Sequence, residues 1–187
     1  MNKPFQLFVL CASCNASQPA VVTVAPIASP STPPPLVHVE TAAPVPEHAV
    51  DINFENMVHL VATRIDPEHA SHGDHVKLTF TWRCDAAPGD GWQLFTHLYD
   101  AKSNKTDNLD YAGPLREPDA RSRQRMGPER WEAGQTYIDK QTYRIPDWVT
   151  GPLIVYVGVW RADTRMHVVA GPNDGENRGI AGKIDVK

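Results

Sequence analysis

Beyond residue 51 the chain is dominated by an alternation of apolar and polar residues. The clearest case is residues 75–84, where every second side chain is apolar: Val76, Leu78, Phe80, Trp82 and Cys84. Successive side chains of a β-strand point to opposite faces, so this segment is predicted to be a strand with one face in a core and the other in water. Residues 153–160 are apolar on both faces, which predicts a central strand.

Five more segments have the composition of strands, and turn-forming Gly, Pro, Asn and Asp residues separate them. They are residues 57–65, 92–100, 136–145, 166–170 and 180–186. About seven strands, with only a short helix predicted near residues 117–125, indicate an all-β fold. We therefore predict a single antiparallel β-sandwich, immunoglobulin-like or jelly-roll-like, over residues 51–187. Its predicted core includes Val76, Leu78, Phe80, Trp82, Val155 and Val157.

The segment before the sandwich has a different composition. Eight of the 28 residues from Pro19 to Pro46 are proline. Proline lacks the backbone donor that a sheet requires and favours an extended, solvated chain. Residues 15–50 are therefore predicted to be a disordered tether.

Residues 1–14 have the order of an export signal, with one lysine, a short apolar run and small residues before a cysteine. The sequence Leu10-Cys-Ala-Ser-Cys14 is similar to a bacterial lipoprotein box, which predicts lipidation of Cys14 and a membrane-anchored protein on the periplasmic side of the envelope. Plain secretion and a cytosolic N-terminus remain open alternatives. Cys11 and Cys14 are spaced as C-x-x-C, but no second ligand pair for zinc follows them.

Charge and hydropathy exclude two classes of function. The net charge is −4, with 21% charged residues, so the chain lacks the strongly basic face expected of a nucleic-acid-binding protein. No stretch of about 20 apolar residues predicts a membrane-spanning helix.

Four segments of the predicted sandwich resemble a known module. They are GDHVKLTFTW at residues 73–82, LFTHLYD at 94–100, WEAGQTYID at 131–139 and VGVW at 157–160. This set is similar to the extracytoplasmic C-terminal domain of bacterial mannosyltransferase-like membrane glycosyltransferases and to related lipoproteins of myxobacterial type. The resemblance implies a β-sandwich and an extracytoplasmic setting. It carries no catalytic residues, and the chain lacks the transferases' membrane helices, so transferase activity is not expected.

Three clusters of side chains suggest metal or redox chemistry, each with a simpler explanation. His69, His72, Asp74 and His75 have the chemistry of a zinc or copper site, but they occupy one turn and the start of a strand, which favours a solvated turn. Oxygen-rich residues 102–110 and 173–177 lack the spacing of an EF-hand and suit ordinary turns. Cys84 lies on an apolar face, which favours a small buried side chain over a reactive pair with His97.

Two further groups of residues are candidates for binding. Arg116, Arg121, Arg123 and Arg125 crowd the long 101–130 segment and could contact an anion, although nearby carboxylates interrupt the run. Trp92, Trp131 and Trp148 stand at strand edges or turns, where they either contact a ligand or plug the ends of the sandwich.

No nucleophile elbow, zinc-protease motif, P-loop or dinucleotide fingerprint occurs. We therefore expect a non-catalytic, envelope-associated accessory module without a cofactor. Its expected partner is a protein of an envelope complex, in preference to a glycan, and the 101–130 segment is expected to offer an adaptable surface. The alternative is a metal-dependent enzyme or metal carrier that uses His69, His72, Asp74 and His75.

Overall fold

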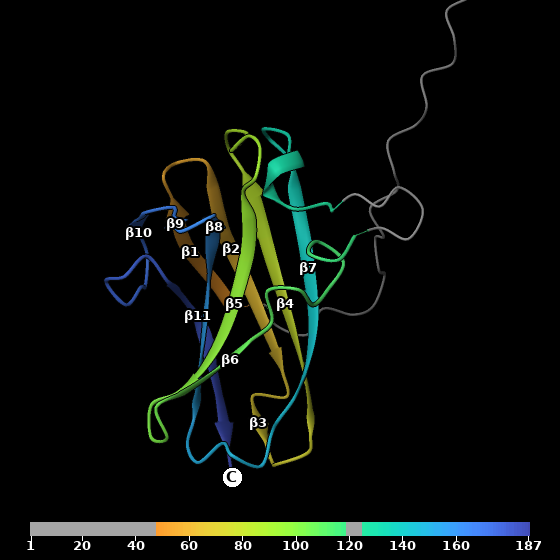
Figure 1. Ribbon diagram of the computed structural model, residues 1–187, viewed down its shortest axis with the longest axis vertical. Coiled ribbons are helices and arrows are strands. Elements are labelled where there is room, and N and C mark those ends of the chain that lie inside the picture. Colours follow the sequence, from red (N-terminus) through yellow and green to blue (C-terminus); the bar gives the residue numbers. More distant parts are fainter. Residues whose placement is uncertain (1–47, 119–124) are drawn as a thin grey trace, which may run out of the picture. The chain divides into compact units, whose positions relative to one another are not determined.

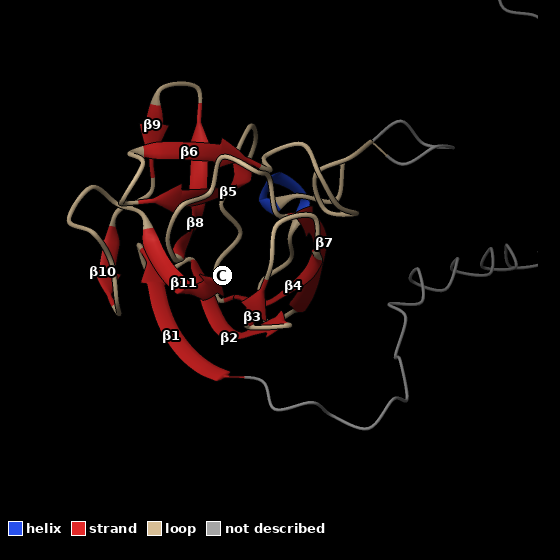
Figure 2. Cartoon of the chain, turned by 90° about the horizontal axis from the view of Figure 1, so that it is seen from below, coloured by secondary structure: helices blue, strands red, loops and turns tan. Residues whose placement is uncertain are grey.

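The computed structural model of the protein describes residues 48–118 and 125–187. Two open sheets face each other and form a β-sandwich, seen from the side of the strands in Figure 1 and from below in Figure 2. The predicted fold class is thereby confirmed. Within the described part of the chain, no helix is long and apolar enough to cross a membrane.

The first sheet contains five strands in the order β10, β1, β2, β4 and β7. They span Val168–Ala170, His48–Phe54, Val58–Asp66, His75–Cys84 and Thr136–Arg144. The second sheet has the order β3, β11, β8, β5 and β6, spanning His69–Ala70, Gly179–Val186, Leu153–Arg161, Gln93–Asp100 and Lys105–Asn108. The short β9, Thr164–Arg165, pairs with β8. Only the two-residue contact between β11 and β3 is parallel among these pairings.

The predicted strands and core agree closely with the structure. β4 covers residues 75–84 as predicted, and the other six segments match β2, β5, β7, β8, β10 and β11 to within two residues at each end. The six predicted core side chains all have 0% exposure: Val76, Leu78, Phe80, Trp82, Val155 and Val157. They lie on the inner faces of β4 and β8, where the two sheets pack together.

Strands β1, β3, β6 and β9 are absent from the prediction, and the predicted tether and helix also differ from the structure. The predicted tether ends too late, because β1 begins at His48 and pairs with β2 from that residue. β6 has the polar sequence Lys-Thr-Asp-Asn and no alternation, and it forms as the returning arm of a hairpin, with His97 opposite Asn108. The predicted helix near 117–125 lies partly outside the described residues, and its described ends are not helical. A single 3₁₀ turn, η1, follows at Pro128–Arg130.

Residues 1–47 lie outside the described part of the chain, and with them the predicted export segment, Cys14 and most of the tether. Arg121 and Arg123 also lie outside it.

The fully buried carboxylate of Asp100 joins two connections at one end of the second sheet. It accepts hydrogen bonds from the Lys102 amide at 2.8 Å, the Ser103 hydroxyl at 2.9 Å and the Thr150 amide at 2.7 Å. Burial by itself acts to raise the pKa of Asp100, but the hydrogen bonds from Thr150, Ser103 and Lys102 outweigh it and hold the pKa well below its usual range. The folded state therefore favours the ionised form.

We predict that Asp100→Asn destabilises the domain at pH 7 and that this loss disappears in acid. The unfolded carboxyl has a pKa of about 3.9, and the folded one is lower, so ionised Asp100 stabilises the folded state fully above about pH 5. That contribution falls as the pH drops below about 4. Urea unfolding of the two proteins between pH 7 and pH 2 should show converging stabilities, whereas Asp147→Asn, which changes an exposed carboxylate, should leave a small and nearly constant difference. A gap that widens in acid would contradict this assignment.

Candidate functional site

A buried ion pair between Arg116 and Asp139 links the two sheets. Arg116 belongs to the connection between β6 and β7, and its Nη2 lies 2.7 Å from Asp139 Oδ2 on β7 of the first sheet. The same nitrogen donates to Thr96 Oγ1 on β5 of the second sheet at 2.8 Å. The exposed fractions of the two charged side chains are 2% and 0%. Burial raises the pKa of Asp139, and the Arg116 guanidinium counteracts that rise.

The connection that carries Arg116 is bound along β7. Gln141 Nε2 donates to the carbonyl oxygens of Leu109 at 2.9 Å and Ala112 at 2.7 Å. Gly113 has a φ of +97°, and a Cβ there would lie 2.6 Å from the Lys140 carbonyl oxygen. Only glycine combines this conformation with so close an approach. Residues 109–116 are therefore fixed against the sandwich, which corrects the expectation of an adaptable surface for this part of the 101–130 segment.

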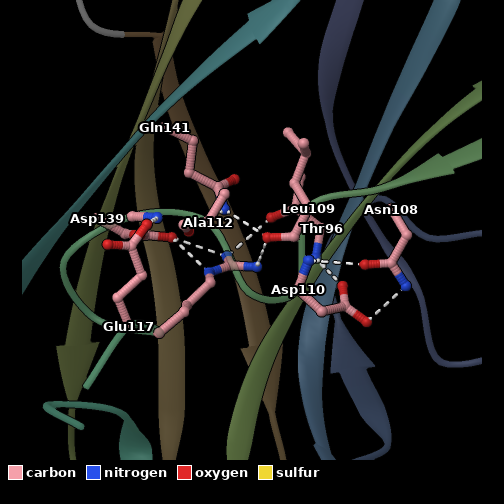
Figure 3. Close-up of polar contacts among 10 residues, drawn as sticks. Thr96, Asn108, Leu109, Asp110, Ala112, Glu117, Asp139 and Gln141 are labelled. Atoms are coloured by element: carbon pink, nitrogen blue, oxygen red, sulfur yellow. Dashed lines mark hydrogen bonds and ion pairs between the residues drawn. The ribbon is translucent and has the colours of Figure 1, made fainter.

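Thr96 connects the buried ion pair to a second carboxylate at the surface of the second sheet. Its amide donates to Asp110 Oδ1 at 3.0 Å, while Asp110 Oδ2 accepts from Asn108 Nδ2 at 2.9 Å (Figure 3). His97 Nε2 lies 3.4 Å from the same oxygen. Burial acts to raise the pKa of Asp110, but the contacts with His97 and the Thr96 amide outweigh it and lower that pKa. Asp110 is thus held as an ionised acceptor that orients His97.

Asp110 and His97 line a pocket of about 660 Å³ on the outer face of the second sheet. Its size falls in the range typical of small-molecule sites, about 300–1,000 Å³. Aromatic, amide and charged side chains surround it together: Phe95, His97, Asn108, Asp110, Trp160, Asp163, Arg165, His167, Glu176 and Asn177, with Ala162 and Thr164.

The register of three strands places the aromatic residues on one face of the pocket. Phe95 and His97 are two residues apart on β5, and their rings lie 5.0 Å apart. Phe95 is opposite Gly158 on β8, where a Cβ would come within 2.4 Å of the Phe95 ring, so glycine leaves the space that this ring occupies. Trp160 on β8 is opposite Arg165 on β9, and the Arg165 guanidinium lies 5.6 Å from the Phe95 ring centre.

The connection between β10 and β11 forms another wall of the pocket. Arg178 pairs with Asp174, contacts Glu176 at 3.3 Å, and stacks over the Tyr156 ring at 4.6 Å. Asn177 Oδ1 accepts a hydrogen bond from the Val168 amide at 3.2 Å. Burial acts to raise the pKa of Asp174, but hydrogen bonds from the Glu176 amide and from Arg178 lower it. The wall is therefore held by its own hydrogen bonds and ion pairs.

The three predicted binding tryptophans do not lie in this pocket, and two of them are buried. Trp131 is 2% exposed and stacks on Tyr137 at 4.5 Å, and Trp92 is 8% exposed beneath the Arg161 guanidinium. Trp148 is half-buried, with Lys105 Nζ 5.7 Å from its ring centre. The prediction of ligand contact is therefore wrong for Trp131 and Trp92, because both pack as plugs of the hydrophobic core.

Two members of the predicted arginine cluster, Arg116 and Arg125, lie among the described residues and contact different partners. Arg116 is buried in the ion pair with Asp139, so its assignment to a surface anion site is wrong. Arg125 Nη1 donates to Gln93 Oε1 at 3.0 Å. These two arginines act within the structure, one between the sheets and the other against β5.

The four residues of the alternative metal site have separate roles. His72 Nε2 contacts the Val149 carbonyl oxygen at 2.7 Å, Asp74 Oδ2 accepts from the Ser71 amide at 2.8 Å, and His69 Nδ1 lies 3.5 Å from Asp185. His75 is exposed at the start of β4. Residues 48–118 and 125–187 contain no group of three or more His, Cys, Asp or Glu side chains arranged to hold a metal ion. The four side chains are therefore not brought together as the alternative metal site would require.

The oxygen-rich segments and Cys84 have structural roles as well. Asp174 Oδ1 accepts from the amides of Glu176 and Arg178, as turn residues do, and Asp107 Oδ2 accepts from the Tyr143 hydroxyl at 3.1 Å. Cys84 is a buried free thiol whose pKa is raised by burial. These features agree with the simpler explanation that the sequence favoured in each case.

The pocket was missed although the sequence carries a signal for it. Residues 153–160 are apolar on both faces, which predicted a central strand. In a two-layer sandwich the outer face of a central strand still meets solvent unless something covers it. Tyr156 and Trp160 on that face, with Phe95 and His97 on the outward face of the neighbouring strand, therefore indicated a covered or ligand-binding surface.

Comparison with known proteins assigns no family. No protein-family model matches the chain, and no curated protein matches it.

We predict that Arg116→Met lowers the free energy of unfolding by about 3–5 kcal/mol, because it leaves the Asp139 carboxylate buried without a charged partner. Asp139→Leu should cost a similar amount for the reciprocal reason. The double variant should be more stable than Arg116→Met alone, since neither charge is then left unpaired. Chemical unfolding of the four proteins measures this coupling, and strictly additive losses would show that the two charges do not depend on each other.

Proposed function

We propose that this protein is a non-catalytic, envelope-associated binding module whose ligand is a glycan bound in the pocket of the second sheet. The observation that carries the proposal is the composition of that pocket. Trp160, which is half-buried, supplies aromatic surface above the buried Phe95 ring, while Asn108, Arg165 and Asn177 supply planar hydrogen-bonding groups. A sugar ring has apolar faces and a polar rim, so a site that combines aromatic rings with amide and charged groups suits it.

The distribution of exposed apolar residues favours a glycan over a protein partner. The large exposed apolar side chains among the described residues are Tyr111, Met126, Ile138 and Val169. Ile138 is on β7 and Val169 is on β10, which are the opposite edges of the first sheet. A specific protein interface is built around a contiguous core of apolar anchors. Compared with these separate exposed apolar side chains, the pocket is the more concentrated recognition surface.

The contacts of two of the three pocket carboxylates support binding rather than catalysis. Asp110 is engaged by Thr96, Asn108 and His97, and Glu176 contacts Arg178. Carboxylates held in such contacts fix the shape of a site. A general acid or base instead needs a proton position that the reacting group can reach.

We predict that Trp160→Ala weakens glycan binding by at least about tenfold, which corresponds to about 1.4 kcal/mol. Trp148→Ala is the matched control, since it removes a half-buried tryptophan that does not line the pocket. A glycan array probed with the purified full chain identifies the ligand, and calorimetric titration then compares the three proteins. Equal losses in both variants, or no glycan bound by the wild type, would defeat the proposal.

The proposed localisation to the envelope rests on the export-like residues 1–14, the lipoprotein-like Cys14 and the proline-rich segment that follows. We predict that labelled palmitate fed to the native host is incorporated into this protein and is absent from Cys14→Ala. Label that persists in the variant would exclude Cys14 as the lipidation site, and an unlabelled wild type would refute the lipid anchor.

A further inference from the structure

We infer that the pocket recognises an acidic saccharide, a uronic acid unit whose carboxylate pairs with Arg165. This inference rests on the proposed function, because it specifies the class of glycan that the same pocket binds.

Among the three carboxylates that line the pocket, Asp110 and Glu176 have charged or multiple polar partners, and Asp163 accepts a hydrogen bond from the Thr164 hydroxyl at 3.4 Å. Asp110 is engaged by His97, Asn108 and the Thr96 amide, and Glu176 Oε2 lies 3.3 Å from Arg178 Nη2. The third, Asp163, is exposed in the two-residue turn between β8 and β9. Glu176 thus has a cationic partner, Asp110 is held by hydrogen bonds, and Asp163 lies at the tip of a hairpin.

Arg165 is a pocket cation that has no carboxylate partner among the described residues. Its Nη1 donates to the Glu176 carbonyl oxygen at 3.3 Å, and its guanidinium lies over the Phe95 ring. Within the described residues, no carboxylate oxygen lies within 4.0 Å of it, whereas Arg64, Arg83, Arg116 and Arg178 each have one. A guanidinium has five N–H donors in a planar fork, so Arg165 retains donors in the geometry that a carboxylate accepts.

The surroundings of Arg165 suit a carboxylate carried on a ring. Arg165 is directly opposite Trp160, and the ring of Phe95 lies beneath its guanidinium. A saccharide packed against the half-buried Trp160 ring would place a ring substituent near Arg165, its partner across the strands. The contact with Phe95 and the hydrogen bond to Glu176 hold the guanidinium in place, which reduces the entropy lost on binding.

The test uses the purified full chain and three acidic probes: tetragalacturonate, tetramannuronate and a hyaluronan tetrasaccharide. Each is compared with its methyl ester, which keeps the sugar and removes the charge. We expect calorimetric titration to show that at least one acid binds at least tenfold more tightly than its ester. Arg165→Gln should abolish this preference. Arg161→Gln, the same charge change at an arginine that stacks on Trp92 outside the pocket lining, should preserve it.

The outcomes separate this inference from the proposed function. If neutral saccharides or the esters bind but no acid is preferred, or if Arg165→Gln keeps the preference, the inference is wrong and the glycan-binding function survives. If no acidic or neutral saccharide binds, both are wrong. If polyglutamate competes as strongly as the best uronate, the site recognises carboxylates in general and the saccharide assignment is wrong.

Discussion

The Arg116–Asp139 ion pair is the contact on which the arrangement of this domain depends. A charged side chain that is almost fully buried is strongly destabilising unless an opposite charge and hydrogen bonds compensate it. Arg116 meets that condition only where the β6–β7 connection crosses from the second sheet to the first, because Thr96 and Asp139 lie on different sheets. A single guanidinium therefore contacts both sheets and belongs to the connection, and it adds to the core packing between the sheets.

Thr96 links this buried ion pair to the pocket. Thr96 accepts from Arg116 with its hydroxyl and donates to Asp110 with its amide, so the buried pair and the pocket carboxylate share a partner. Asp110 in turn contacts His97 and Asn108 on the outer face of the second sheet. The interior of the sandwich thus determines where the polar side of the pocket lies. The aromatic side depends instead on strand register and on the absence of a side chain at Gly158.

The parts of this structure that the sequence predicts are those governed by side-chain periodicity. Alternation in residues 75–84 identifies β4 and its core face because a sheet buries one side of each strand. β6 lacks this signal, since its polar residues pair only because the hairpin returns them to β5. β1 was not predicted because it directly follows the proline-rich segment.

Arg116 and Trp131 were misassigned because residue type alone does not tell whether a charge or an indole is buried. That outcome depends on partners distant in sequence, such as Asp139 for Arg116. The pocket combines residues from β5, β8, β9 and the β10–β11 connection, a juxtaposition that no local pattern specifies.

The central claim is that ligand binding occurs on the outer face of the second sheet, over Phe95, His97, Trp160 and Arg165. The most direct test is an NMR titration of the isotopically labelled full chain with the saccharide that binds best, following assigned backbone amides. The account predicts that the largest shifts map to β5, β8, β9 and the β10–β11 connection, with little change at Trp131 and Trp148. Shifts centred on those two tryptophans or on the turn at residues 69–75, with the pocket amides unmoved, would contradict it.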